Sequence, residues 1–180
     1  MMRKLRHAKR TGEFNKGADD YETPRNALEM ILRDVPHHNL IWDPFFCTGH
    51  VLQFFDALGY RCINVNRDFF KYEPFLYDII VTNPPYSIKD AVLTRLLQLG
   101  RPFAALMPLS TIATAYFFTL MRNRTYQLVI ANRRFNFLRH NNEPKTKNKV
   151  CTFATVWVTV GFEAFLKTTQ QIVHRETHTY

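Results

Sequence analysis

Short apolar runs alternate with amphipathic stretches along most of the chain. Five runs have the length and composition of buried strands: 39–42, 60–65, 78–82, 102–109 and 126–131. Between them, apolar residues recur at helical spacing, as in 25–34, where Ala27 and Ile31 fall on one face. This alternation predicts an α/β domain whose sheet is mostly parallel.

Local signals indicate where three of the helices begin or end. Gly59 is expected to end a helix over 51–58. Ser87 is expected to cap a helix that begins at Ala91, and Ser110 to cap the helix that follows it. Helices in these places would connect successive strands, as a parallel sheet requires.

The two ends of the chain follow different patterns. Residues 150–160 form a long β-rich run, which is predicted to pair back as an antiparallel hairpin strand. Residues 1–19 are polar, basic and aperiodic and are predicted to be a mobile tail, while 166–180 are predicted to be a polar tail. One domain is therefore expected over 20–165.

Composition and net charge indicate which class of molecule the protein binds. A chain of 180 residues with 46% hydrophobic content is long enough for one domain with a full core. The formal net charge of +9 favours a polyanionic partner, most simply nucleic acid. Part of this charge lies in the first sixteen residues, so a soluble protein with a basic tail is the alternative explanation.

The cysteines indicate the compartment. Cys47, Cys62 and Cys151 are odd in number and widely spaced, which is typical of free thiols in a reducing compartment. No zinc or other metal site is expected, since no Cys-x-x-Cys pair occurs and the histidines are scattered. No secretory signal or membrane span is visible, so an intracellular location (cytoplasm or nucleus) without a membrane partner is expected.

The stretch 83–86 reads Asn-Pro-Pro-Tyr and follows the buried run 78–82. Prolines donate no backbone hydrogen bond, so Asn83 and Pro84 present carbonyl oxygens that need partners, and the Asn83 side chain adds another acceptor. Such acceptors at the carboxyl end of a strand suit the two N–H bonds of a planar amino group, on a heterocycle or an amide. Tyr86 would stack on the ring. Alternatively, the prolines only end a core strand and the tyrosine packs in the core.

A second stretch, 43–50, joins the run 39–42 to the helix 51–58. Loops in this position bind nucleotide-like cofactors in doubly wound folds. The loop has one glycine, unlike a phosphate-binding fingerprint, and its aspartate suits an ammonium or sulfonium group better than a pyrophosphate. Both a ligand-binding loop and an ordinary strand-to-helix turn fit this pattern.

Residues 132–149 are rich in Arg, Lys and Asn, with phenylalanines between them. Aromatic rings among cations suit base stacking combined with phosphate contacts, although a solvated hairpin loop would have a similar composition. The candidate nucleic-acid-binding residues are Arg133, Arg134, Phe135, Lys145, Lys147 and Lys149.

Taken in order, the stretches 21–24, 43–49, 68–70 and 79–86 resemble the S-adenosylmethionine-dependent amino-methyltransferases, in particular the small phage- and virus-type N6-adenine methyltransferases. A further block at 99–110 is similar, and the resemblance covers 21–162. It implies an α/β, Rossmann-like methyltransferase fold: a mostly parallel sheet with helices on both faces and a terminal antiparallel hairpin strand. The usual strand between 68 and 78 is expected to be short or missing.

The resemblance also implies roles for individual residues. The catalytic residues would be Asn83, Pro84, Pro85 and Tyr86, which would hold the target amino group and stack on its base. The residues implied to bind S-adenosylmethionine are Tyr21, Thr23, Pro24, Asp43, Pro44, Phe45, Gly49, Asn66, Asp68 and Phe69. The Asp43 loop would line the methionine end of the cofactor, and the 68–70 stretch its adenine.

Two positions depart from the family pattern. Cys47 stands where the family often has a glycine, so a loop residue that needs a positive φ is expected to be strained. Asn66 stands where the family usually has an acidic residue that binds ribose hydroxyls, so either Asn66 substitutes for that residue or Asp68 serves both purposes.

The leading hypothesis is therefore methylation of the exocyclic N6 of adenine in nucleic acid, with DNA slightly favoured over RNA. The first alternative is N-methylation of glutamine in a protein, because a side-chain amide fits the same acceptors. The second is a nucleic-acid-binding module that kept the fold and lost cofactor affinity, as the missing acidic residue would suggest.

Overall fold

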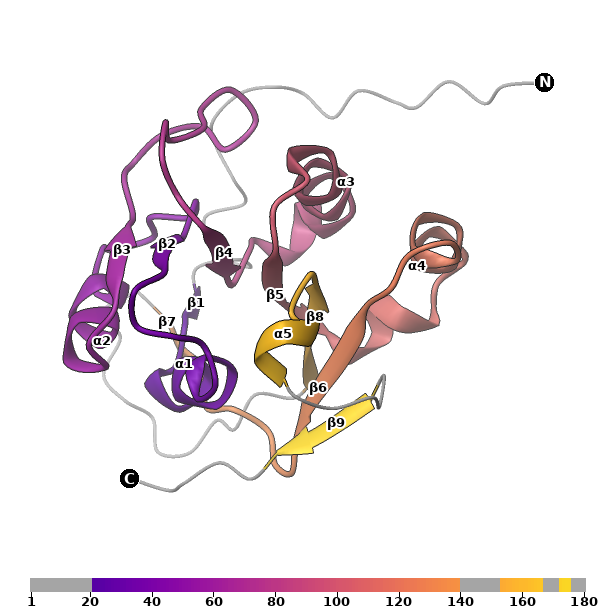
Figure 1. Ribbon diagram of the computed structural model, residues 1–180. Helices are drawn as coiled ribbons and strands as arrows, with labels where there is room; N and C mark the ends of the chain where they lie inside the picture. The colour runs from indigo at the N-terminus through magenta and orange to yellow at the C-terminus, as the bar shows by residue number, and fades with distance from the viewer. Residues whose placement is uncertain (1–20, 140–152, 167–171, 176–180) are drawn as a thin grey trace.

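The computed structural model describes residues 21–139, 153–166 and 172–175, which form a central sheet with helices on both faces (Figure 1). The first half contains β1 (Tyr21–Glu22), α1 (Arg25–Leu32), β2 (Leu40–Trp42), α2 (Val51–Ala57), β3 (Arg61–Ile63), β4 (Ile79–Thr82), the 3₁₀ helix η1 (Tyr86–Ile88) and α3 (Lys89–Leu99). The second half contains β5 (Phe103–Pro108), the 3₁₀ helix η2 (Leu109–Ala113), α4 (Ala115–Met121), β6 (Gln127–Ala131), β7 (Leu138–Arg139), β8 (Thr155–Val160), α5 (Glu163–Leu166) and β9 (Ile172–Arg175).

The large sheet has seven strands in the order β3-β2-β4-β5-β8-β6-β9. All of them run parallel except β8, which lies antiparallel between β5 and β6. The predicted α/β fold with a mostly parallel sheet and an antiparallel hairpin strand is confirmed. β1 and β7 form a separate two-stranded antiparallel ribbon.

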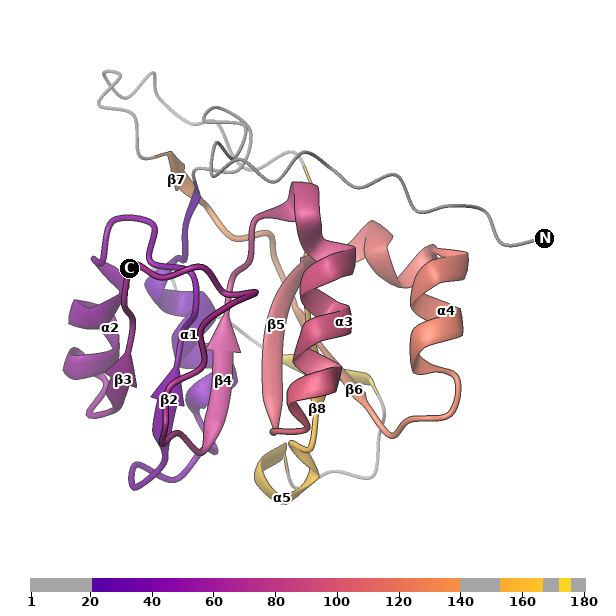
Figure 2. The same ribbon diagram turned by 90° about the horizontal axis from the view of Figure 1, so that it is seen from above.

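Alternation along the strands produces two cores, one on each face of the sheet. In β4, Ile79 and Val81 face the core under α1 and α2, while Ile80 faces the core under α3 and α4. The helices lie on opposite sides of the sheet accordingly (Figure 1). Figure 2 shows β4, β5 and α3 running side by side. The chain on either side of the 83–86 stretch, β4 before it and α3 after it, is therefore packed at the centre of the sheet.

No strand lies between β3 and β4, as expected from the sequence. Aromatic packing occupies this part of the structure instead. The ring of Trp42 lies 5.0 Å from that of Tyr77 and 5.7 Å from that of Phe69, and Arg101 lies over the Tyr77 ring. Edge-to-face and tilted ring pairs are favourable geometries, so the loop is packed against the sheet without pairing to it.

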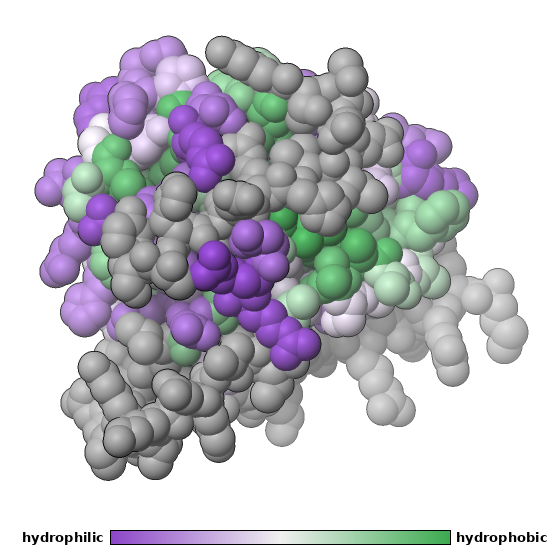
Figure 3. All heavy atoms as spheres, turned by 90° about the horizontal axis from the view of Figure 1, so that it is seen from below, coloured by the Kyte–Doolittle hydropathy of each residue, from purple (hydrophilic) through white to green (hydrophobic). Residues whose placement is uncertain are grey.

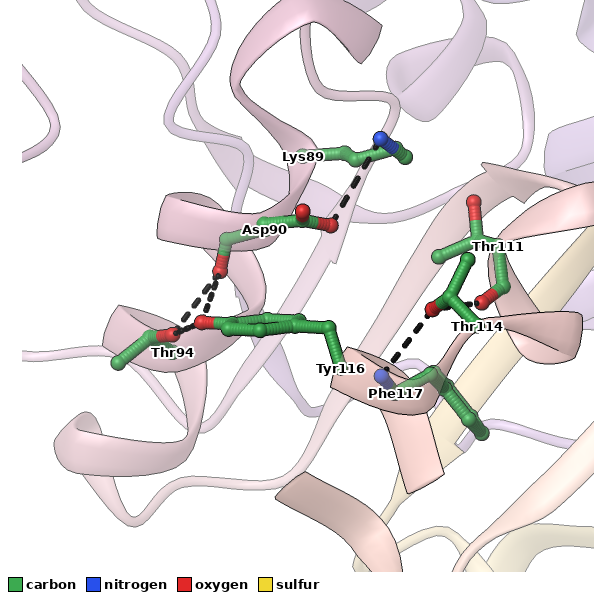
Figure 4. Close-up of polar contacts among 7 residues, drawn as sticks. All are labelled: Lys89, Asp90, Thr94, Thr111, Thr114, Tyr116 and Phe117. Carbon is green, nitrogen blue, oxygen red and sulfur yellow. Dashed lines mark hydrogen bonds and ion pairs between the residues drawn. The ribbon is translucent and has the colours of Figure 1, made fainter. Parts of the chain in front are cut away.

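Both expected serine caps are wrong. Ser87 lies inside η1, which runs directly into α3, and Ser110 lies inside η2. Thr114 has the extended backbone of a helix cap, and its hydroxyl accepts a hydrogen bond from the Phe117 backbone N–H at 3.1 Å (Figure 4). Tyr116 then joins α4 to α3 through contacts with the Thr94 hydroxyl and the Asp90 carbonyl oxygen (Figure 4).

The predicted domain end at 165 is too early. β9 pairs with β6 in parallel, with Leu128 opposite Ile172, and so extends the sheet into the expected tail. A four-residue edge strand carries too few apolar positions to be recognised by alternation. The 1–19 tail lies outside the described residues.

Among the residues that the structure describes, most large apolar side chains are buried. Four of the six exposed ones there fall in the stretch 65–76: Val65, Phe70, Phe75 and Leu76. On the face seen from below, a hydrophobic area lies among hydrophilic residues (Figure 3). Within the described part of the chain, no helix has both the length and the apolar character needed to cross a membrane.

Candidate active site at the ends of β2 and β4

Two neighbouring strands end in the two motifs that the sequence singled out. β2 and β4 are parallel partners, with Ile41 opposite Ile79, so Asp43 and Asn83 emerge at the same edge of the sheet. The Thr82 hydroxyl donates a 2.6 Å hydrogen bond to Asp43 Oδ1, which joins the two strand ends directly. Ligands bind at this edge of open α/β sheets.

Asp43 is a buried carboxylate with no cationic partner among the described residues. It is 3% exposed, and Oδ1 accepts from Thr82 and, at 3.3 Å, from the Phe45 backbone N–H. Burial raises the pKa of Asp43 to about 7, although these two hydrogen bonds act to lower it. A positively charged ligand group would favour the ionised form of this side chain.

The loop after Asp43 is shaped by its neighbours. Asn64 donates through Nδ2 to the carbonyl oxygens of Asp43 (3.0 Å) and Phe45 (3.3 Å). Gly49 has φ +79°, and a Cβ there would lie 3.0 Å from Cζ of the Phe46 ring, so both its backbone and its surroundings require glycine. Cys47 has φ +44°, which confirms the strain expected at that position.

β1 closes over this loop and over Asn83. Glu22 Oε1 accepts from the Thr48 hydroxyl at 3.1 Å and lies 3.2 Å from His50 Nδ1. The Asn83 amide nitrogen points to the Tyr21 carbonyl oxygen at 3.5 Å. Neither Glu22 nor His50 was found from the sequence, because nothing local indicates that 22 and 50 meet.

The Asn83 side-chain carbonyl is buried without a hydrogen-bond partner among the described residues. Its orientation is physically determined, because turning the amide round would place its oxygen against the Tyr21 carbonyl oxygen. An unsatisfied buried acceptor costs about 1–3 kcal/mol, so the site favours a ligand that brings a donor.

Tyr21, Asn83, Pro84 and Tyr86 line a pocket of only about 10 Å³, roughly the room of one water molecule. The Tyr86 ring stands edge-on to Phe153, 5.6 Å away, and Phe137 lies 6.1 Å beyond it. A base is much larger than this pocket, so it would enter only if the side chains that line the pocket move. Phe137 was noted in the sequence only as one of the aromatic rings among the cations of 132–149. Phe153 was not found from the sequence, because only the fold brings it here.

No family model and no curated protein matches this sequence. Among solved structures, a dimethyladenosine transferase from Plasmodium falciparum is similar with a TM-score of 0.50 and 13% identity, over 83% of this chain and 66% of that one. The chain has a methyltransferase fold.

Two further structures have lower TM-scores. The methyltransferase subunit of a type I restriction-modification system from Streptococcus thermophilus gives 0.47 at 11% identity, over 88% of this chain and 48% of that one. A predicted O-methyltransferase from Agrobacterium tumefaciens gives 0.42 at 9% identity, over 86% of each chain. This methyltransferase-fold chain thus spans just under two thirds of the first relative and about half of the second.

The other cofactor positions implied by the resemblance fall into three groups. Asn66 and Asp68 are exposed after β3, and Asp68 Oδ1 accepts from the Phe70 backbone N–H at 2.9 Å. Pro24 is the N-cap of α1 and Thr23 directly precedes it, while Pro44 follows Asp43 in the 43–50 loop. Phe69 is only 3% exposed and packs on Phe45, so as it stands it cannot contact a ligand.

The candidate nucleic-acid-binding residues differ in their exposure to solvent. Arg133 and Arg134 are exposed after β6. Phe135 is 2% exposed and packs in the core beside Phe137, so stacking on a base would require its ring to leave the core. The reason is that the aromatic side chains of 135 and 137 cover the β1 side of the core rather than the surface. Lys145, Lys147 and Lys149 lie outside the described residues.

Cys47 and Cys62 are free thiols, as expected, and Cys151 lies outside the described residues. Burial and the nearby Asp43 raise the pKa of the Cys62 thiol, which makes it a poor nucleophile. The described residues contain no group of three or more His, Cys, Asp or Glu side chains arranged to bind a metal ion.

Proposed function

We propose that this protein is an S-adenosylmethionine-dependent methyltransferase that methylates the N6 amino group of adenine in nucleic acid, with DNA favoured over RNA. One observation carries the proposal: the unsatisfied carbonyl of Asn83 lies at the strand end next to Asp43, a buried carboxylate without a cationic partner in the described structure. The first needs a hydrogen-bond donor and the second a cation.

The residues at the end of β2 fit S-adenosylmethionine. Asp43 would bind its ammonium or sulfonium end, because a cation restores the ionised form that burial disfavours. Gly49 allows the tight turn of the loop, and Asn64 fixes its carbonyl groups. Asp68 would accept from the adenosine part, with Asn66 beside it on the same exposed stretch. When bound, the cofactor supplies an electrophilic methyl group.

The residues at the end of β4 fit a flat amino group. The Asn83 side chain and the Pro84 carbonyl would accept its two hydrogens and so orient the nitrogen lone pair toward the cofactor site. Asn83 does not take a proton, since an amide is not basic at neutral pH. Tyr86 would stack on the base once the mouth of the pocket opens. In a duplex the base must first be flipped out, at a cost of a few kcal/mol.

Nucleic acid as the substrate is supported by charge. The chain carries +9, and the exposed Arg133 and Arg134 extend from the end of β6 at the same edge as the two motifs. The similar Plasmodium falciparum structure is itself described as a dimethyladenosine transferase. Arginine contacts to phosphates would weaken with salt and be independent of sequence.

The test is transfer of a radioactive methyl group from S-adenosylmethionine to separate samples of DNA, RNA and glutamine-containing peptides. We expect label in nucleic acid and none in peptides, with roughly 10²- to 10³-fold less label in nucleic acid treated with Asn83→Ala. Label confined to peptides would support glutamine methylation instead.

The binding-module alternative has one observation in its favour: Asn66, an amide, occupies the exposed position after β3 where the resembled family has an acid. Calorimetry with S-adenosylmethionine separates the two functions. Micromolar binding supports the enzyme, while nucleic-acid binding without any cofactor binding supports the module.

A further inference from the structure

Phe69 lies between the 43–50 loop, which follows β2, and helix α3, which follows the 83–86 motif. Its buried ring packs on Phe45 of the 43–50 loop, with centroids 5.2 Å apart, and on Trp42 of β2 at 5.7 Å. A ring enclosed in this way holds the segments around it in place. Its position therefore ties the exposed 66–70 stretch to the loop that begins at Asp43.

Arg95 of α3 holds Phe69 from the other side. Its Nε donates a 2.7 Å hydrogen bond to the Phe69 backbone oxygen, and its guanidinium carbon lies 5.5 Å from the centroid of the Phe69 ring. Both the hydrogen bond and the cation–π contact are favourable in a half-buried setting. Across the described residues, this hydrogen bond is the only polar contact between α3 and the stretch 64–72.

α3 is continuous with the Asn-Pro-Pro-Tyr motif. Tyr86 begins η1, which runs into α3 at Lys89, and Arg95 follows about two helical turns later. Val92 and Leu96, on the same helix, pack in the same core cluster as Phe69. A helix packed in this way moves as a unit, so a shift of the 68–70 stretch is felt at the motif.

We propose that Arg95 is a positioning residue that couples cofactor binding at the 68–70 stretch to target binding at 83–86. The inference rests on the proposed function. A cofactor that binds Asp68 would hold the 68–70 stretch. Through the contacts between Phe69 and Arg95 it would also hold α3 and fix the motif before the base arrives. Each ligand then binds more tightly when the other is present, and by the same factor.

The test measures the affinity of S-adenosylhomocysteine by calorimetry, with and without a saturating adenine-containing oligonucleotide, so that no methyl transfer occurs. We expect the oligonucleotide to tighten binding by roughly 5- to 150-fold in the wild-type protein, the usual range of coupling between two sites. In Arg95→Lys, which keeps the charge but not the planar Nε donor, and in Arg95→Leu, this ratio should fall to about 1. The reciprocal effect of S-adenosylhomocysteine on oligonucleotide affinity should disappear with it.

Arg101 offers a matched control. Its guanidinium carbon lies 5.6 Å over the ring of Tyr77, which packs on Trp42 as Phe69 does, but Arg101 precedes β5 and so lies at the opposite edge of the sheet. Arg101→Leu should lose stability as Arg95→Leu does and still keep the wild-type ratio.

Retention of the wild-type ratio in both Arg95 variants, or its equal loss in Arg101→Leu, would overturn the coupling role alone. A wild-type protein that binds the oligonucleotide but not S-adenosylhomocysteine would overturn the proposed function, and this inference with it.

Discussion

The ends of β2 and β4 are neighbours in the sheet, yet their polar groups are in opposite situations. Asp43 at the end of β2 accepts two hydrogen bonds from the protein itself, from Thr82 and from the backbone of Phe45. Asn83 at the end of β4 has a buried carbonyl that accepts none from the described residues. Within the described structure, the Asp43 carboxylate has hydrogen-bond donors but no cation beside it, whereas the Asn83 carbonyl has no hydrogen-bond donor.

The difference indicates which ligand each end is suited to bind. A buried carboxylate with a pKa near 7 gains most from a cation, whereas a neutral carbonyl gains most from an N–H group. A shared hydrogen bond between Thr82 and Asp43 keeps the two sites in register. A substitution at Asp43 or at Asn83 should therefore impair ligand binding at its own strand end and leave the other strand end intact.

The largest effect is expected at Asn83. Asn83→Ala removes the side-chain acceptor and should lower the turnover number by roughly 10²- to 10³-fold, the range seen when one oriented hydrogen-bonding group is removed from an active site. Affinities for cofactor and nucleic acid should change little, because the strand, prolines and stacking ring remain. Steady-state kinetics alongside binding measurements check this, with the exposed Asn123→Ala as control. Near-normal turnover would break the assignment.

Asp43 should give the cofactor site a pH dependence. Because burial raises the pKa of Asp43 to about 7, S-adenosylmethionine affinity should increase as the pH rises from 5.5 to 7.5. Asp43→Asn should remove that dependence and weaken binding by roughly 10- to 100-fold at pH 7.5, the loss of one charge-assisted interaction. Calorimetry at several pH values measures both effects. A pH-independent wild-type affinity would contradict the role of this carboxylate.

The Asp43 carboxyl group should also make the free energy of unfolding depend on pH. The folded protein binds the Asp43 proton more tightly than the unfolded chain does, because the pKa rises from 3.8 to about 7. The contribution of Asp43 to the free energy of unfolding should therefore fall as the pH rises through this window. Asp43→Asn should be the more stable protein at pH 7.5, which thermal melts of the two proteins would show.

Tyr86 should have a smaller effect that is confined to the target. Tyr86→Ala removes base stacking, on the order of 1–3 kcal/mol, while both acceptors remain. The KM for nucleic acid should rise by a corresponding 5- to 150-fold, and turnover should partly recover at high substrate concentration. Tyr86→Phe keeps the ring and should restore most of the lost affinity. A KM that Tyr86→Ala leaves unchanged would show that the ring does not contact the base.

The smallest effect is expected at Gly49. Both Gly49→Ala and Gly100→Ala place a side chain at positive φ, at about 1 kcal/mol of stability each. Only at Gly49 would the new Cβ meet another group, the Phe46 ring at 3.0 Å, whereas Gly100 has open space. Gly49→Ala should therefore also weaken cofactor binding a few-fold. Equal affinities in the two variants would exclude the loop from the cofactor site.

The strands and the two motifs could be predicted from the sequence because their signals are local. Buried runs identified β2, β4 and β5, and strand-end position placed Asp43 and Asn83 at one edge. Contacts between distant segments could not be predicted: Glu22 meets His50, and Phe153 meets Tyr86, only because β1 and β8 are brought there by the fold.

The local sequence pattern also could not predict which aromatic residues are buried. Phe135 lies between Arg134 and Asn136, and Phe69 follows Asp68 in a stretch that also contains the exposed Phe70, yet both Phe69 and Phe135 are enclosed by long-range packing. The resemblance aligned Phe69 with a ligand contact, whereas its neighbours here are Trp42, Phe45 and Arg95. Residue type alone does not reveal which side of a loop faces the core.

The central claim is that the acceptors at the end of β4 hold the exocyclic amino group of adenine. Mass spectrometry of nucleosides, after nucleic acid has been incubated with the protein and isotope-labelled S-adenosylmethionine, tests it most directly. We expect labelled N6-methyladenosine, in its deoxy form from DNA, and a yield roughly 10²- to 10³-fold lower with Asn83→Ala. Labelling of another base or ring position, or no labelled nucleoside from either DNA or RNA, would contradict it.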